Sequence, residues 1–175
     1  MTHNFLNIDL NNITKKLNFT FLIDMGKSLL ISKENEKTEN SLQNLRNSTQ
    51  DNTLFKINSE VFNIHSNKQE LISSLDCFYS PSNEALCIII EDQVKLKELS
   101  KQIISNLMEF STKVSAKSLI LLIDKKNKEY VKIMQSMMMI GFNNDSNNKS
   151  ANISGKEYKV LKLDTNSGEI EEIAF

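Results

Sequence analysis

Residues 119–142 read LILLIDKKNKEYVKIMQSMMMIGF, and they decide the fold class of this 175-residue chain. Five consecutive apolar residues, 119–123, are typical of a strand that is buried on both faces. Charged and amide residues follow, and then a helical pattern over 126–140 ends at Gly141, where a helix favours a residue with left-handed backbone. A strand that leads directly into an amphipathic helix is half of a βαβ crossover unit.

The helical part of this stretch predicts one buried side and one exposed residue. The side chains expected to be buried are Tyr130, Ile133, Met134, Met137 and Met138. Phe142 supplies the apolar contact that usually accompanies a glycine helix end. Met139 falls outside the apolar stripe, so we expect it to be exposed.

Working outward, the chain predicts further strands and a second long helix. Residues 85–91 (ALCIIIE) indicate a buried strand. Residues 95–114 indicate a helix, because Leu96, Leu99, Ile103, Leu107, Phe110 and Val114 recur at three- and four-residue steps. The shorter elements are strands at 19–23 and 28–32 around a turn at 25–27, a strand at 54–64, a short helix at 67–75, a turn at 79–82, and strands at 158–163 and 170–175. This order predicts one α/β or α+β domain, a mixed sheet flanked by two main helices.

Two polar segments interrupt these elements. Residues 33–53 contain only two leucines as large apolar side chains, so we expect this segment to be flexible. Residues 143–156 indicate a long polar loop. We therefore divide the chain into an N-terminal region, 1–53, and the main α/β unit, 54–175.

Composition excludes several classes of partner and location. The 21 basic and 22 acidic residues nearly cancel, so nothing indicates nucleic-acid binding. There is no 18-residue apolar run and no signal-peptide pattern, so we expect no membrane association. Two cysteines are too few for a disulfide framework. We expect a cytoplasmic protein, with the nucleus as a further location.

The pattern of ligating residues indicates neither a metal site nor a nucleophile. His3 and His65 are far apart, and Cys77 and Cys87 form no pair motif. Cys87 lies inside an apolar strand, where burial keeps a thiol inert, whereas Cys77 is expected to be more exposed. His65 is interpreted as an ordinary loop histidine. We predict no catalytic and no metal-binding residues.

Glycine spacing excludes the usual phosphate-binding loops. The four glycines stand at positions 26, 141, 155 and 168, too far apart to form one cradle of backbone amides. We therefore expect no bound cofactor. The carboxylate pairs Glu91-Asp92 and Glu171-Glu172 stand at element ends, where solvated charge is the ordinary interpretation.

One set of residues resembles a known family. Residues 124–129 (DKKNKE) are followed, after eleven residues, by Gly141-Phe142. Lys101 and the triplet 108–110 (MEF) precede them, and 157–164 (EYKVLKLD), 167–169 (SGE) and Glu171-Glu172 follow. In this order and spacing the chain resembles ornithine decarboxylase antizymes over about residues 85–172. It departs from their pattern at Asp124, where the family usually has histidine, and in the absence of Pro and Gly before Lys101.

The resemblance implies a fold like that of GNAT-type acetyltransferases without the acetyl-CoA loop, and no enzymatic activity. Antizymes bind ornithine decarboxylase as a heterodimer, block its active homodimer, and present it to the proteasome without ubiquitin, which regulates polyamine levels. The resemblance further implies antizyme inhibitor as a partner and a message read by ribosomal frameshifting.

The resemblance assigns the partner-binding role to Lys101, Glu109, Lys125 and Asp164. Lys101 and Glu109 are eight residues apart, about two helical turns, and should share a face. Lys125 is expected beside them at a strand end. Two other functions remain open: a divergent GNAT-type N-acetyltransferase, and an unrelated α/β adaptor whose Met-rich helix docks another protein.

Overall fold

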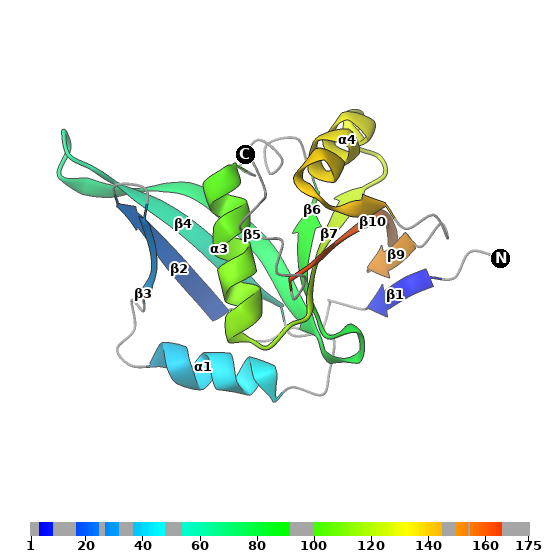
Figure 1. Cartoon of the computed structure of the whole chain (residues 1–175), viewed down its shortest axis with the longest axis horizontal. Helices are drawn as coiled ribbons and strands as arrows, with labels where there is room; N and C mark the ends of the chain where they lie inside the picture. Colours follow the sequence, from blue (N-terminus) through cyan, green and yellow to red (C-terminus); the bar gives the residue numbers. More distant parts are fainter. Residues whose placement is uncertain are drawn as a thin grey trace.

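The computed structural model describes residues 4–8, 17–24, 27–31, 37–47, 54–91, 100–144, 150–153 and 155–165 (Figure 1). The strands in these ranges are β1 (Asn4–Ile8), β2 (Leu17–Asp24), β3 (Lys27–Ile31), β4 (Leu54–Asn63), β5 (Lys68–Ser80), β6 (Ala85–Ile90), β7 (Ser118–Asp124), β8 (Asn143–Asn144), β9 (Ser150–Ile153) and β10 (Lys156–Asp164). The helices are α1 (Lys37–Arg46), α3 (Lys101–Lys113) and α4 (Tyr130–Ile140), with a short 3-10 helix, η1, at Pro81–Asn83.

All these strands join one mixed sheet in the order β1-β9-β10-β7-β6-β5-β4-β2-β3, and β8 pairs with β10. β6 and β7 are parallel, as a crossover through α3 requires. β2 is parallel to β4 and β1 to β9, whereas the other neighbours are antiparallel. The predicted fold class, a single mixed α/β sheet with flanking helices, is confirmed.

β6 and β7 form the centre of the sheet because they are apolar along almost their whole length. Every residue of β6 is buried, and so is every residue of β7 before Asp124. A strand that is covered on both faces favours apolar residues at every position, which explains the continuous apolar runs at 85–90 and 119–123.

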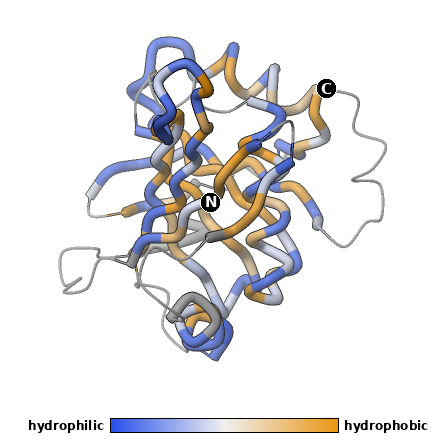
Figure 2. Tube along the Cα trace, turned by 90° about the vertical axis from the view of Figure 1, so that its left-hand side faces the viewer, coloured by the Kyte–Doolittle hydropathy of each residue, from blue (hydrophilic) through white to orange (hydrophobic). Residues whose placement is uncertain are grey.

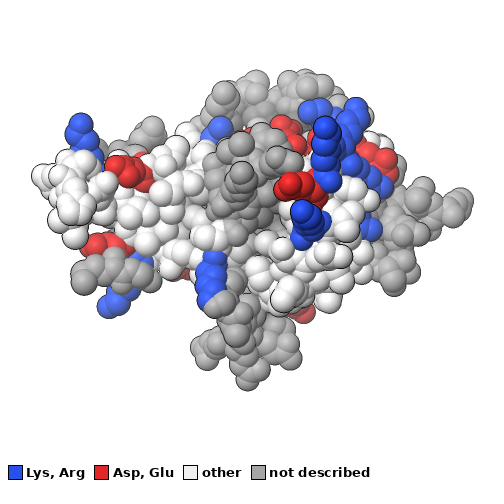
Figure 3. Space-filling model, turned by 90° about the horizontal axis from the view of Figure 1, so that it is seen from above, with Lys and Arg blue, Asp and Glu red and all other residues white. Residues whose placement is uncertain are grey.

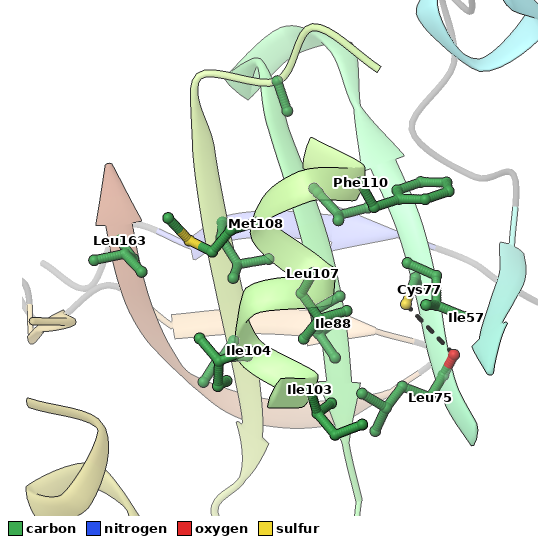
Figure 4. Packing of buried hydrophobic residues seen from close by; sticks show 14 of the residues in the cluster. Ile57, Leu75, Cys77, Ile88, Ile103, Ile104, Leu107, Met108, Phe110 and Leu163 are labelled. Atoms are coloured by element: carbon green, nitrogen blue, oxygen red, sulfur yellow. Dashed lines mark hydrogen bonds between the residues drawn. The ribbon is translucent and has the colours of Figure 1, made fainter. Parts of the chain in front are cut away.

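The main core lies between the sheet and the three helices, and a smaller core lies on the opposite face. Figure 4 shows α3 directing Ile103, Ile104, Leu107, Met108 and Phe110 towards Ile57, Leu75, Cys77, Ile88 and Leu163 of the strands. The second cluster includes Phe78, Cys87, Ile89, Ile120, Leu122, Tyr158 and Val160. Figure 2 shows hydrophobic residues concentrated along the central strands and hydrophilic residues in many of the outer turns.

The segment predicted to be flexible, 33–53, contains α1, so that prediction is wrong for residues 37–46. Leu42 and Leu45 are each 2% exposed and belong to the main core. A spacing of three residues places both leucines on one side of a helix, and their burial stabilises the polar turns around them. Residues 33–36 and 48–53 lie outside the described residues.

The helix predicted at 67–75 is wrong, because this segment belongs to β5. Asn63 pairs with Lys68 and Leu54 with Phe78, which makes β4 and β5 a long antiparallel hairpin. Its turn includes Asn67, whose φ is 55°. Hydrogen bonding across the hairpin overrides the local pattern. The turn predicted at 79–82 is confirmed in part by η1, although Tyr79 and Ser80 still belong to β5.

α3 is terminated by side-chain and backbone hydrogen bonds. Ser100 is extended, and its Oγ accepts a hydrogen bond from the Ile103 N–H at 3.4 Å, so this helix begins at Lys101 and not at the predicted residue 95. At the other end, the Ala116 N–H donates to the Ser111 carbonyl at 2.8 Å, and Ser115 has φ 61°. A serine thus occupies the left-handed position that glycine usually fills. Leu96 and Leu99 lie outside the described residues.

α4 ends as predicted but begins later, at Tyr130. Gly141 has φ 122°, and the Phe142 N–H donates to the Met137 carbonyl at 3.0 Å. Met137 is buried, whereas Met138 is 46% exposed and Met139 89% exposed. The prediction of a buried Met138 is wrong, because one residue along a helix turns the side chain by ~100°, here past the edge of the core.

The polar loop predicted at 143–156 contains two strands. β8 and β9 both pair antiparallel with β10, and Ala151 and Ile153 of β9 are buried on either side of the more exposed Asn152. The strand predicted at 158–163 is confirmed within β10. The strand predicted at 170–175 lies outside the described residues.

Candidate protein-binding surface

α3 carries two of the four predicted binding residues on its outer side. Lys101 and Glu109 are both exposed, whereas Ile103, Ile104 and Leu107 between them are buried. Eight residues place the two side chains ~80° apart around the helix and ~12 Å apart along it. The shared face is therefore observed, and the binding role of the two residues stays a prediction.

A polar network beneath α3 fixes the rotation of the helix. Asn106, which is 1% exposed, donates from Nδ2 to the Ser59 Oγ of β4 at 3.2 Å and accepts from the Gln102 Nε2 at 3.3 Å. Gln102 Nε2 also donates to the Ser28 Oγ of β3 at 2.7 Å. Buried polar groups need hydrogen-bond partners, and these partners are within reach in only one orientation of the helix. The network therefore sets which residues of α3 face outward.

The junction between β7 and α4 is a turn built on Asp124 and Asn127. Asp124 Oδ1 accepts from the Lys126 N–H at 2.9 Å, and Asn127 Oδ1 accepts from the Glu129 N–H at 3.0 Å. The Asn127 N–H donates to the Asp124 carbonyl, also at 3.0 Å. Such side-chain turns compete with helical hydrogen bonds, which explains why α4 starts at Tyr130 and not at 126.

Lys125 projects from this junction and forms an ion pair. Its Nζ lies 2.8 Å from Glu157 Oε1 of β10. Both side chains are more than a third exposed, so the pair contributes at most ~1 kcal/mol to stability and mainly orients Lys125. Lys125 follows the carboxyl end of β7, and α3 begins above the carboxyl end of β6, at the top in Figure 1.

Asp164 lies at the opposite end of the sheet from Lys125. In the pairing of β10 with β7, Asp164 is opposite Ser118 and Tyr158 is opposite Asp124. Six residue steps at ~3.3 Å each separate the two ends by ~20 Å. The four predicted residues therefore do not form one cluster: Lys101 and Lys125 lie at one end of the sheet, Asp164 at the other, and Glu109 between them along α3.

Sequence reasoning missed a tyrosine–carboxylate pair at the carboxyl end of β6. Tyr158, which is almost fully buried, donates from Oη to Glu91 Oε1 at 3.2 Å. Burial, followed by the Glu91 carboxylate and then Asp124, raises the pKa of Tyr158 well above its usual value. The phenol therefore stays protonated, and remains a hydrogen-bond donor, to a higher pH than an ordinary tyrosine. No local pattern connects residues 67 positions apart.

In the described part of the chain, both cysteines are buried and His65 is exposed. Cys77 is fully buried and donates from Sγ to the Leu75 carbonyl at 3.4 Å (Figure 4), so the expectation that it is more exposed is wrong. Burial, with a smaller contribution from Asp76, raises the pKa of its thiol. Cys87 is buried, as predicted, and His65 is exposed in the β4–β5 turn. No three His, Cys, Asp or Glu side chains among the described residues are grouped so that they could hold a metal ion.

Lysines concentrate around the start of α4. Figure 3 looks onto the carboxyl end of β6 and β7, and most of its visible lysines and arginines gather on the side where α4 lies. Residues 125–132 contain four lysines and one glutamate. All five of these side chains are exposed.

Comparisons with known proteins leave the family open. No family model and no curated protein matches this chain. In the described residues, no helix is both long enough and apolar enough to cross a membrane. One solved structure, a nourseothricin acetyltransferase, is similar at a TM-score of 0.36 and 16% identity, covering 55% of this chain and 59% of that one. This distant likeness carries no conclusion about activity, and membership of the antizyme family is not shown.

Proposed function

We propose that this protein is a non-catalytic inhibitor that captures another polypeptide on the outer face of α3. The partner that the sequence resemblance indicates is the ornithine decarboxylase monomer. The observation that carries the proposal is the exposure of Lys101 and Glu109 on one side of a helix whose other side is locked into the core.

A rigid helix suits this role because its charges are held in place before the partner arrives. The Ser100 cap, the Asn106 network and the Phe110 side of α3 fix its ends, rotation and depth. Charges presented in this way guide encounter and set register more than they add raw affinity. Lys125, oriented by Glu157 at the same end of the sheet as Lys101, extends the surface.

Inhibition by capture requires no chemistry on the part of the inhibitor. The decarboxylase active site is completed at its homodimer interface, so a protein that occupies that surface on the monomer removes activity by mass action. Release of the monomer to the proteasome without ubiquitin and control of polyamine levels are then consequences of the same binding event.

The alternative function is a GNAT-type N-acetyltransferase. That chemistry needs backbone amides that approach a pyrophosphate closely, and the segment between β6 and α3 contains no glycine over 91–100. Calorimetric titration with acetyl-CoA separates the two functions. Saturable binding would favour the transferase, and no heat of binding at millimolar ligand is the result expected from the inhibitor.

The inhibitor is tested by titrating the decarboxylase of the same organism with this protein and measuring decarboxylation. Activity should fall in proportion to the added protein. Lys101→Glu and Glu109→Lys should each weaken inhibition about tenfold, equivalent to about 1.4 kcal/mol.

Matched charge reversals are available on the distant β4–β5 hairpin. Lys68 and Glu70 are both exposed there, so Lys68→Glu and Glu70→Lys make the same changes of charge away from α3. They should leave inhibition unchanged. Equal effects of the α3 and hairpin variants would show that α3 is not the binding surface.

A further inference from the structure

The outer face of α4 carries exposed apolar side chains that the fold does not use. Val131, Met138 and Met139 are 49%, 46% and 89% exposed. Val131, Met138 and Met139 follow the i, i+7, i+8 spacing of one helical stripe, in which the polar Gln135 takes the i+4 position. The opposite side of α4 packs against the main core through Tyr130, Ile133, Met134 and the buried Met137. α4 is thus apolar on two sides, and only one of these sides packs against the main core.

The beginning of α4 adds positive charge to this stripe. Glu129 takes the N-cap position without a side-chain hydrogen bond to the helix, and the first turn of α4 contains no acidic residue. Lys126, Lys128 and Lys132 are exposed around it. Lys132 precedes Met139 by seven residues, two helical turns, and therefore lies on the same side of the helix.

We propose that the outer face of α4 docks an amphipathic helix of a partner protein, with acidic residues at the end that lies over the lysines. Methionine side chains are flexible and polarisable, and they adapt to apolar surfaces of different shape. The charge around the first turn selects carboxylates at one end of the docked helix and so fixes its direction. This surface lies on α4 and not on α3, and the proposal does not depend on the proposed function.

Peptide binding to the full-length protein tests this docking. The probe is a fluorescein-labelled synthetic peptide of about 18 residues that has leucines on one side and glutamates at one end. A control peptide has the same sequence with lysines in place of the glutamates. Fluorescence anisotropy should show micromolar binding of the acidic peptide and at least tenfold weaker binding of the basic one. Raising NaCl from about 0.05 M to about 0.5 M should weaken the acidic complex several-fold.

Substitutions on α4 test where the acidic peptide binds. Met139→Glu and Lys132→Glu should each weaken the acidic peptide at least tenfold, and neither residue is buried, so both variants should keep the fold. Leu71→Glu makes the same apolar-to-acidic change at another exposed residue, on the β4–β5 hairpin, and should have no effect.

Three results would overturn the proposal. The first is an acidic peptide that does not bind or that binds Met139→Glu as well as the original protein. The second is binding of anionic phospholipid vesicles through Met139 and Lys132 without peptide binding, which would make α4 a membrane contact. The third is a dimer of this chain, measured by light scattering, that Met139→Glu dissociates, because a second copy would then cover the face.

Discussion

Replacing Phe110 by alanine should reveal how strongly α3 is attached to the N-terminal strands. Phe110 is fully buried, and its ring centroid lies 4.9 Å from that of Phe19 in β2 and 5.5 Å from that of Phe55 in β4. Among the described residues, these three aromatic rings join α3 to β2 and β4. The Phe110→Ala substitution removes one of three rings that all contact one another, and it leaves a cavity.

The expected cost is about 3–5 kcal/mol of unfolding free energy. The two ring pairs account for about 0.5–1.5 kcal/mol each, and loss of apolar burial together with the cavity accounts for the rest. At roughly 2–4 °C per kcal/mol for a chain of this size, the Tm should fall by about 6–20 °C.

Urea unfolding followed by circular dichroism measures this loss, and Phe62 provides the matched control. Phe62 stands at the far end of β4 and is more than a third exposed, so Phe62→Ala should cost less than ~1 kcal/mol. If the two substitutions cost the same, α3 is not packed on β2 and β4 as described, and its outer face is not a rigid surface.

Three further predictions concern other parts of the molecule. Because burial and Glu91 raise the pKa of Tyr158, the folded state retains a proton that the unfolded chain loses above pH ~10; stability should fall as pH rises from there towards the folded pKa, and Tyr158→Phe should flatten this decline in pH-dependent urea unfolding. If the unfolding free energy of Tyr158→Phe falls with pH as steeply as that of the original protein, Tyr158 does not cause the decline. Cys77 should not react with a thiol reagent in the native protein and should react on unfolding, because its thiol is buried and its pKa is raised; fast native labelling measured by mass spectrometry would contradict this. Ser115→Gly should raise the unfolding free energy by about 0.5–1 kcal/mol, because glycine adopts φ 61° without strain, and a lower Tm would argue against the left-handed helix end.

The elements that sequence reasoning predicted correctly are those with strong local patterns. The apolar runs of β6 and β7 match strands that are covered on both faces of the sheet. The buried stripe of α3 and the Gly141 end of α4 follow from spacing and from backbone conformation alone.

The elements that it missed depend on distant partners. α1 is stabilised by two leucines that both pack in the main core. The composition of the segment alone does not indicate this packing. β5 is a strand because β4 lies beside it and hydrogen bonds with it along its length.

The same limit applies to the candidate surface. The shared face of Lys101 and Glu109 follows from helical spacing within one element. The separation of Lys125 from Asp164 depends on the antiparallel pairing of β10 with β7, which no single segment encodes. The bond from Tyr158 to Glu91 depends on the same pairing, because it crosses β7.

The molar mass of the complex with ornithine decarboxylase tests the central claim most directly. Light scattering during size-exclusion chromatography of an equimolar mixture should give one species with the mass of one decarboxylase subunit plus one copy of this chain, and no decarboxylase homodimer. A homodimer peak of unchanged mass, with this protein eluting separately, would contradict the account.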